Sequence, residues 1–216
     1  MKKLLLVFLS LIPLLVFSEE FESNGIRYQT TTMFGDFHLI VSNNNGKYSG
    51  DIVIPEKVEY NGKIWTVYII GEYAFAKCEN LVSVFIPKSI AGVGFHAFYG
   101  CSNLTKIVVD DDNEFLDSRD NCNAVINKSN NCLISGCKGS KIPNTIKAIN
   151  SFAFEGSSIE EIVIPESVEE IWTSAFNDCY NLRKIIVDDA NPIYDSRDNC
   201  NAIISTKTNY WCPIKN

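Results

Sequence analysis

The sequence predicts a mainly β solenoid, in which short repeats stack side by side and each contributes the same elements. Three observations predict it: an internal duplication, a shorter repeat within that duplication, and an apolar alternation that opens each repeat. Residues 84–131 and 162–209 align without a gap and are identical at 24 of 48 positions. A chain that repeats itself builds an extended surface from like groups, whereas catalysis brings unlike groups to one point. The pattern therefore favours binding over catalysis.

The shorter repeat is about 23 residues long and is marked by the pattern Ile-x-Ile-Pro. Aspartate replaces the proline in two copies, so that the markers in chain order are Pro55, Pro87, Asp110, Pro143, Pro165 and Asp188. Successive markers are 32, 23, 33, 22 and 23 residues apart. Repeats of roughly 20 to 29 residues with Leu-x-x-Leu-x-Leu spacing are typical of leucine-rich repeats. The spacing thus predicts a leucine-rich-repeat solenoid.

Each repeat is expected to open with a short strand and to continue into a tight turn. In residues 81–86 the side chains of Val84 and Ile86 alternate with their neighbours, so both are expected to point to the interior. Pro87 then ends the strand, because proline has no N–H to donate to a ladder. An Ala-Phe pair follows, in which alanine allows close backbone approach and phenylalanine fills the interior. The pairs begin at Ala74, Ala97, Ala153 and Ala175.

The two longer gaps between markers are expected to hold β-hairpins. The first spans residues 59–63, where Asn61-Gly62 is a strong signal for a two-residue turn. The second joins residues 124–126 to residues 132–134. The domain organisation predicted from these patterns is a signal peptide over residues 1–18, a β-rich N-terminal cap over residues 19–50 and a repeat array over residues 51–216.

Three motifs together resemble the BspA-like leucine-rich-repeat proteins. They are Ile-Pro-x-Ser-Val, Ala-Phe-x-x-Cys-x-x-Leu and Asp-Ser-Arg-Asp-Asn-Cys-Asn-Ala, and the resemblance covers residues 51–209. Members of that family are secreted or surface proteins of host-associated bacteria and of some protist parasites, and some are adhesins. The resemblance implies a mainly β solenoid of short parallel strands, turns and short 3-10 or helical segments, with a binding role. It supplies no catalytic residues.

The first eighteen residues are expected to be a signal peptide that is cleaved near Ser18. Lys2 and Lys3 precede an almost wholly apolar run of about 14 residues, which is short for a membrane span. A retained anchor is the alternative. The mature protein is expected to be secreted, to lie at the cell surface or to be periplasmic. Removing the two lysines changes the formal net charge from −7 to −9, which disfavours nucleic acids and anionic membranes as partners.

The eight cysteines of an exported chain would ordinarily suggest disulfides. Cys78, Cys101 and Cys179, however, share one repeat position and are expected to be buried free thiols. The state of the other five stays open, with a bridge from Cys122 to Cys132 or Cys137 among the alternatives; the remaining two are Cys200 and Cys212. No metal or other cofactor is expected, since His38 and His96 match no zinc-ligand spacing, and His96 is expected to face solvent in its turn.

The repeated segment that starts at Asp117 and again at Asp195 is rich in carboxylates and amides, which are ligands that calcium prefers. The order of an EF-hand loop is absent, however. We therefore favour a structural role, in which Arg119 and Arg197 hold aspartates or carbonyls at the base of a hairpin. Catalytic motifs with a nucleophile, a metal-binding pair or a phosphate loop are also absent from the sequence, so no enzyme is predicted.

One outward column of the predicted strands is apolar in every copy and is the candidate binding site. We call it the outward row: Val53, Phe85, Val108, Val163 and Ile186. Either these residues suit parallel strands and cover one another, or they form an exposed stripe on a concave face that grips an extended partner. The second interpretation predicts a protein partner, either a host matrix protein or another surface protein. The alternative is a structural subunit that assembles end to end, and the sequence leaves the ligand and any glycosylation open.

Overall fold

The computed structural model describes residues 18–33, 35–197, 202–207 and 211–212. The predicted signal peptide up to residue 17 lies outside the described residues, as do Cys200 and the side chain of Cys212. The described part of the chain is mainly β and includes a short 3-10 helix, η1 (Arg119–Asn121). The prediction of a mainly β protein with almost no helix is therefore confirmed.

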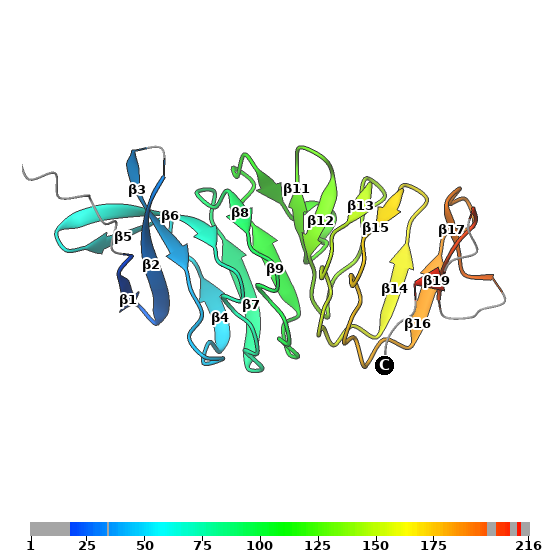
Figure 1. Cartoon of the computed structure of the whole chain (residues 1–216), viewed down its shortest axis with the longest axis horizontal. Helices are drawn as coiled ribbons and strands as arrows, with labels where there is room; N and C mark the ends of the chain where they lie inside the picture. The colour runs from blue at the N-terminus through cyan, green and yellow to red at the C-terminus, as the bar shows by residue number, and fades with distance from the viewer. Residues whose placement is uncertain (1–17, 34, 198–201, 208–210, 213–216) are drawn as a thin grey trace, which may run out of the picture.

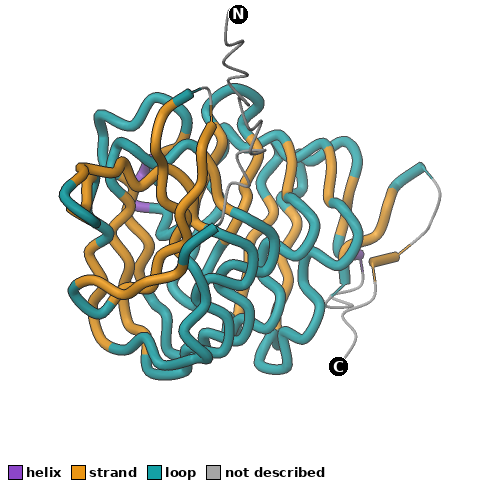
Figure 2. Tube along the Cα trace, turned by 60° about the vertical axis from the view of Figure 1, so that its left-hand side comes forward, coloured by secondary structure: helices purple, strands orange, loops and turns teal. Residues whose placement is uncertain are grey.

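The strands are short and follow one another along the molecule (Figure 1). In chain order they are β1 (Glu20–Ser23), β2 (Ile26–Met33), β3 (Asp36–Val41), β4 (Gly50–Val53), β5 (Lys57–Tyr60), β6 (Lys63–Ile70), β7 (Leu81–Ile86), β8 (Gly92–Val93), β9 (Lys106–Val109), β10 (Leu116–Asp117), β11 (Val125–Asn127), β12 (Cys132–Ser135), β13 (Ala148–Ile149), β14 (Glu161–Ile164), β15 (Glu170–Ile171), β16 (Lys184–Val187), β17 (Tyr194–Asp195), β18 (Ile203–Ser205) and β19 (Trp211–Cys212). Figure 2 shows how strands of successive repeats lie beside one another, joined by turns.

The strands that carry the Ile-x-Ile pattern pair in parallel between repeats. Strand β7 lies between β4 and β9, and β14 pairs with β16. Along β7 the side chains of Leu81, Val84 and Ile86 are fully buried, while Val82 is exposed. The alternation continues in β9, β14 and β16, where the first and third residues point outward. The predicted inward face of these strands is confirmed.

Both predicted hairpins are present. In the first, β5 pairs with β6 and closes through Asn61 and Gly62, whose φ angles of 51° and 69° are those of a tight two-residue turn. In the second, β11 pairs with β12 across residues 128–131. Strand β6 also pairs in parallel with β3 and β8, so that β1, β2 and β3 share one sheet with the first repeat. A capping role for residues 19–50 stays a prediction.

The Ala-Phe turns stack in a column of their own. Phe75 N donates to Ala97 O over 2.8 Å, and Phe154 N donates to Ala175 O over 2.8 Å. The phenylalanine rings stack as well, with centroids 5.3 Å apart for Phe75 and Phe98. The residue before each alanine has a positive φ, although none of the four is glycine: Tyr73, His96, Phe152 and Ser174. Non-glycine residues seldom adopt this conformation. Here the backbone hydrogen bonds between the stacked turns of neighbouring repeats stabilise it.

The expectation that His96 faces solvent is wrong. Its side chain is only 16% exposed, and its Nδ1 lies 2.5 Å from Glu155 Oε2. The imidazole ring stacks on Tyr73 at 4.7 Å and packs against Phe152 at 4.3 Å. These residues are neighbours because the positive φ at this position places the side chain along the column of turns. Sequence separation hides the contact, since His96 and Glu155 are 59 residues apart.

The prediction of buried free thiols at Cys78, Cys101 and Cys179 is confirmed. Cys101 Sγ donates to Phe75 O over 2.9 Å, and Cys179 Sγ donates to Phe154 O over 3.0 Å. Burial raises the pKa of both thiols to about 12, so both stay protonated at neutral pH. Cys122, Cys132 and Cys137 are also free and buried, and no bridge joins them.

We expect Cys101→Ala to lower the free energy of unfolding by only about 1 kcal/mol, because it removes one small buried group and one weak hydrogen bond. Urea denaturation of the two proteins measures the difference. Alkylation of the folded, unreduced protein should leave Cys101 and Cys179 unmodified in a mass spectrum. Loss of folding on this single change would contradict the assignment and would indicate an essential disulfide.

Candidate binding surface

The outward row lies on the strands that pair in parallel, and their register brings its members into line. Val53 is the partner of Phe85, and Phe85 is the partner of Val108. In the second pair of strands Val163 is the partner of Ile186. Residues up to 55 positions apart in sequence, such as Val53 and Val108, thus share one face of the molecule. The five residues nevertheless fall into two groups, because β9 and β14 belong to different sheets.

Exposure differs along the outward row. Val53 is 66% exposed and Val163 is 47% exposed, since each lies on the first strand of its sheet. Phe85, Val108 and Ile186 are half-buried. Neighbouring strands therefore cover part of the row and leave the rest in contact with solvent. The result is a shallow apolar stripe with its most open points at Val53 and Val163.

A chain segment separates the two groups of the outward row. Lys138 N donates to Leu104 O over 3.0 Å, which places residues 138–142 beside the strand face. A groove of about 480 Å³ lies between this segment and β14. Its lining includes Lys138, Lys141, Glu161 and Val163. The segment that leads to the marker Pro143 is not a strand in this copy, and it interrupts the row. The repeat pattern alone could not show this, because it treats each strand as equivalent.

Polar side chains beside the outward row pair from one repeat to the next. Ser83 Oγ donates to Asp51 Oδ1 over 2.5 Å, and Lys184 Nζ lies 3.0 Å from Glu161 Oε1. Lys138 Nζ lies 3.3 Å from Glu160 Oε1. Exposed ion pairs of this kind add little stability. Their effect on the surface is to neutralise these particular charges beside the stripe.

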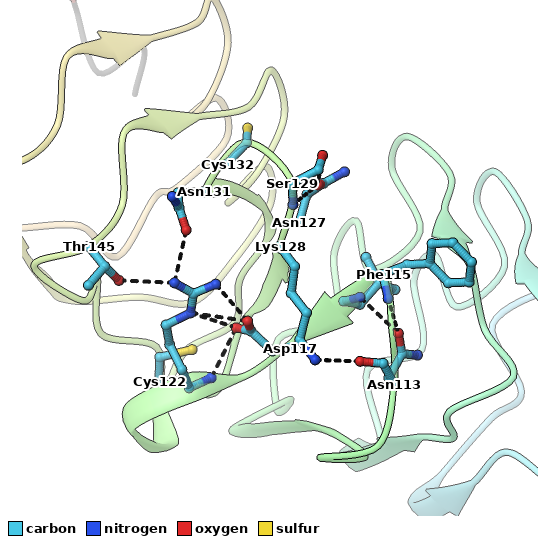
Figure 3. A network of polar contacts seen from close by, with 12 residues as sticks. Asn113, Phe115, Asp117, Cys122, Asn127, Lys128, Ser129, Asn131, Cys132 and Thr145 are labelled. Atoms are coloured by element: carbon cyan, nitrogen blue, oxygen red, sulfur yellow. Dashed lines mark hydrogen bonds and ion pairs between the residues drawn. The ribbon is translucent and has the colours of Figure 1, made fainter.

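The repeated acidic segment is a structural support, as expected. Arg119 Nε and Nη2 donate to both carboxylate oxygens of Asp117 over 2.6–3.1 Å, and Nη1 donates to Asn131 Oδ1 over 2.9 Å (Figure 3). Arg197 pairs with Asp195 in the same way in the second copy. Within the residues that the structure describes, no group of three or more acidic, His or Cys side chains could hold a metal ion.

Two buried asparagines that the sequence patterns did not predict support the same segments. Asn113 Nδ2 donates to Pro87 O and Ile90 O over 3.1 and 2.8 Å, and Asn113 Oδ1 accepts from the N–H groups of two residues that follow it. Asn191 repeats the four bonds in the second copy. Asparagine occupies both equivalent positions of the duplication, 113 and 191, and this identity could have pointed to the pair from the sequence. Each side chain joins its own repeat to the preceding one.

These features define a class of protein: a leucine-rich-repeat protein with parallel strands between repeats and an apolar stripe on their outward face. The sequence pattern described as "BspA type Leucine rich repeat region" matches residues 52–129 and 131–205, in six copies. The chain therefore belongs to the BspA-type leucine-rich-repeat family. No curated protein matches it.

Solved structures of leucine-rich-repeat proteins resemble the chain. A leucine-rich repeat protein from Bacteroides ovatus is 27% identical with a TM-score of 0.50, and the match covers 76% of this chain and 40% of that protein. The leucine-rich repeat protein of T. pallidum is 25% identical with a TM-score of 0.47, over 77% of this chain and 71% of that one. The chain thus spans less than half the length of the Bacteroides protein. Among the described residues, no helix is long and apolar enough to cross a membrane.

Proposed function

We propose that the stacked repeats form an exported solenoid that binds a protein partner along the outward row. The observation that carries the proposal is the solvent-exposed apolar side chain of Val53 beside the half-buried ring of Phe85. Apolar groups in register on a repeated surface suit an extended partner better than a compact small molecule. Leucine-rich repeats generally serve protein interactions, which supports the same conclusion. We propose a host matrix protein or another cell-surface protein as the partner.

The location outside the cell is part of this proposal. It depends on the first eighteen residues, in which two lysines precede a short apolar run. Membership of the BspA-type family is consistent with it.

We expect Phe85→Ala to weaken binding of the partner by more than about 1 kcal/mol, because an aromatic side chain in an interface contributes a large share of the energy. Phe85 is the aromatic member of a row otherwise made of valine and isoleucine. Proteins captured from serum and solubilised extracellular matrix by the immobilised parent are first identified, and their affinity for parent and variant is then measured. The melting temperature should change little, since the neighbouring inward side chains remain.

Val108→Ser is the companion change, because it replaces a half-buried apolar group of the same row with a polar one. If both variants bind as the parent does, the outward row is not the site. If both unfold the protein, the row contributes to stability and not to a free surface. A chain that captures no partner and sediments as a concentration-dependent assembly would instead support the structural alternative, in which repeats associate end to end.

A further inference from the structure

A second surface, distinct from the outward row, has the chemistry of a ligand site. It is a groove of about 230 Å³ over strands β8, β12, β13 and β15, which lie above β7, β9, β14 and β16 in Figure 1. Nine residues line it: Val93, Gly94, Phe95, Asn127, Asn130, Cys132, Ile134, Asn150 and Trp172. None of the nine carries a charge. A pocket that encloses a drug-sized ligand usually measures about 300–1,000 Å³, so this groove suits one or two small rings.

The repeat architecture brings these residues together. Gly94, Asn150 and Trp172 occupy equivalent places, because the N–H of each donates to a strand residue of a preceding repeat over 2.8–3.0 Å. A side chain at Gly94 would lie 2.5 Å from Glu72 N, so only glycine fits at this position. No side chain of residue 94 therefore fills the groove. The hairpin formed by β11 and β12 adds Asn127 and Asn130 from its tip.

Two exposed aromatic rings line the groove. Phe95 is 54% exposed and Trp172 is 45% exposed. Each has a fixed position, because Phe95 rests edge-on against Phe152 at 6.2 Å and Trp172 Nε1 donates to Glu170 Oε2 over 2.9 Å. That hydrogen bond satisfies the indole N–H. What the tryptophan offers a ligand is therefore its ring face, which binds C–H groups.

The three asparagines are held as hydrogen-bond donors. Asn127 Oδ1 accepts from Ser129 N over 2.9 Å, and Figure 3 shows this pair at the hairpin tip. Asn130 Oδ1 accepts from Cys132 N over 3.1 Å, and Asn150 Oδ1 accepts from Ser151 N over 2.9 Å. Each local bond fixes the plane of the amide and leaves its Nδ2 without a hydrogen bond to the described residues. A ligand that forms hydrogen bonds with these N–H donors must carry acceptors such as oxygen atoms.

We propose that this groove binds a neutral oligosaccharide. A sugar ring presents C–H groups on its faces, which suit Phe95 and Trp172, and oxygen acceptors around its edge, which suit the three amides. The absence of charge from the lining residues favours a neutral sugar over an anionic one, because no cation is present to pair with a carboxylate or a sulfate. The groove and the outward row lie on different strands, so this proposal stands apart from protein binding.

Isothermal titration calorimetry of the full chain with maltohexaose, cellohexaose and N-acetylchitohexaose tests the proposal. At least one of them should bind with a Kd below about 10 mM. Trp172→Ala should weaken binding by about tenfold or more, whereas Trp172→Phe should retain most of it because a ring face remains. Tyr180→Ala, which removes an exposed ring outside the groove, is the matched control and should bind as the parent does.

Asn150→Asp isolates the contribution of the amide. The aspartate keeps the oxygen that accepts from Ser151 N but has no Nδ2 donor, so binding should fall by about tenfold while the melting temperature stays near that of the parent. The proposal is overturned if none of the three sugars binds, or if a sugar binds Trp172→Ala as tightly as it binds the parent. Preferential binding of decaproline at the groove would likewise overturn it and assign a peptide site.

Discussion

Asn113→Ala is expected to lower the free energy of unfolding by about 3 kcal/mol or more. The side chain is almost fully buried and uses its amide to bond two carbonyls and two N–H groups. Alanine would remove all four bonds and, because Pro87 O also accepts from Ile90 N, would leave three backbone groups without partners in the interior. Each buried polar group left unpaired costs about 1–3 kcal/mol. Relaxation of the loop and entry of water reduce this loss of stability, so the expected value lies below the sum of the individual costs. Urea denaturation followed by circular dichroism measures the change.

Asn191→Ala should give a similar loss, because Asn191 makes the equivalent four bonds in the second copy. The matched control is Asn144→Ala, which removes an exposed asparagine and should change the free energy of unfolding by less than about 0.5 kcal/mol. An Asn113→Ala protein as stable as the control would contradict the proposed link between repeats.

Phe154→Ala is expected to lower the free energy of unfolding by about 3 to 5 kcal/mol, as truncation of a buried phenylalanine usually does. Its ring is nearly fully buried and stacks on Phe176 with centroids 5.2 Å apart. On its other side the ring lies so close to Gly136 that a side chain there would approach to 2.2 Å. The cavity left by Phe154→Ala would therefore lie between the segments that carry Gly136, Phe154 and Phe176. The melting temperature should fall by about 10 °C.

Tyr180→Ala is the control for this change, because its ring is 70% exposed and its hydroxyl bonds only Asp178 within its own turn. Its melting temperature should match that of the parent within about 2 °C. Equal melting of the Phe154→Ala protein and the parent would show that the column of Ala-Phe turns is not packed as described.

The parts of the fold that depend on local pattern could be predicted from the sequence. Alternation at Val84 and Ile86 determined the inward face, and Asn61-Gly62 determined a hairpin, because both depend on residues within one strand or one turn. The free thiol at Cys101 followed from its repeat position. In each case the repeat places the same residue in the same environment.

Contacts between distant segments could not be predicted in this way. His96 meets Glu155 because two repeats with positive φ at the same position lie side by side, and no local pattern encodes that pair. The break in the outward row arises where residues 138–142 pass between β9 and β14. The groove at Trp172 was missed for a related reason, since two of its three amide donors, Asn127 and Asn130, come from a hairpin inserted between repeats.

Photo-cross-linking from the outward row tests the central claim most directly. Benzoylphenylalanine is placed at Val108 in one protein and at Tyr180, on the column of turns, in another, and each is irradiated with the partner captured by the parent chain. Both substituted proteins should melt as the parent does. A partner that binds along the outward row will cross-link from position 108 and not from position 180. Cross-linking from position 180 alone would contradict the account and would place binding on the turns.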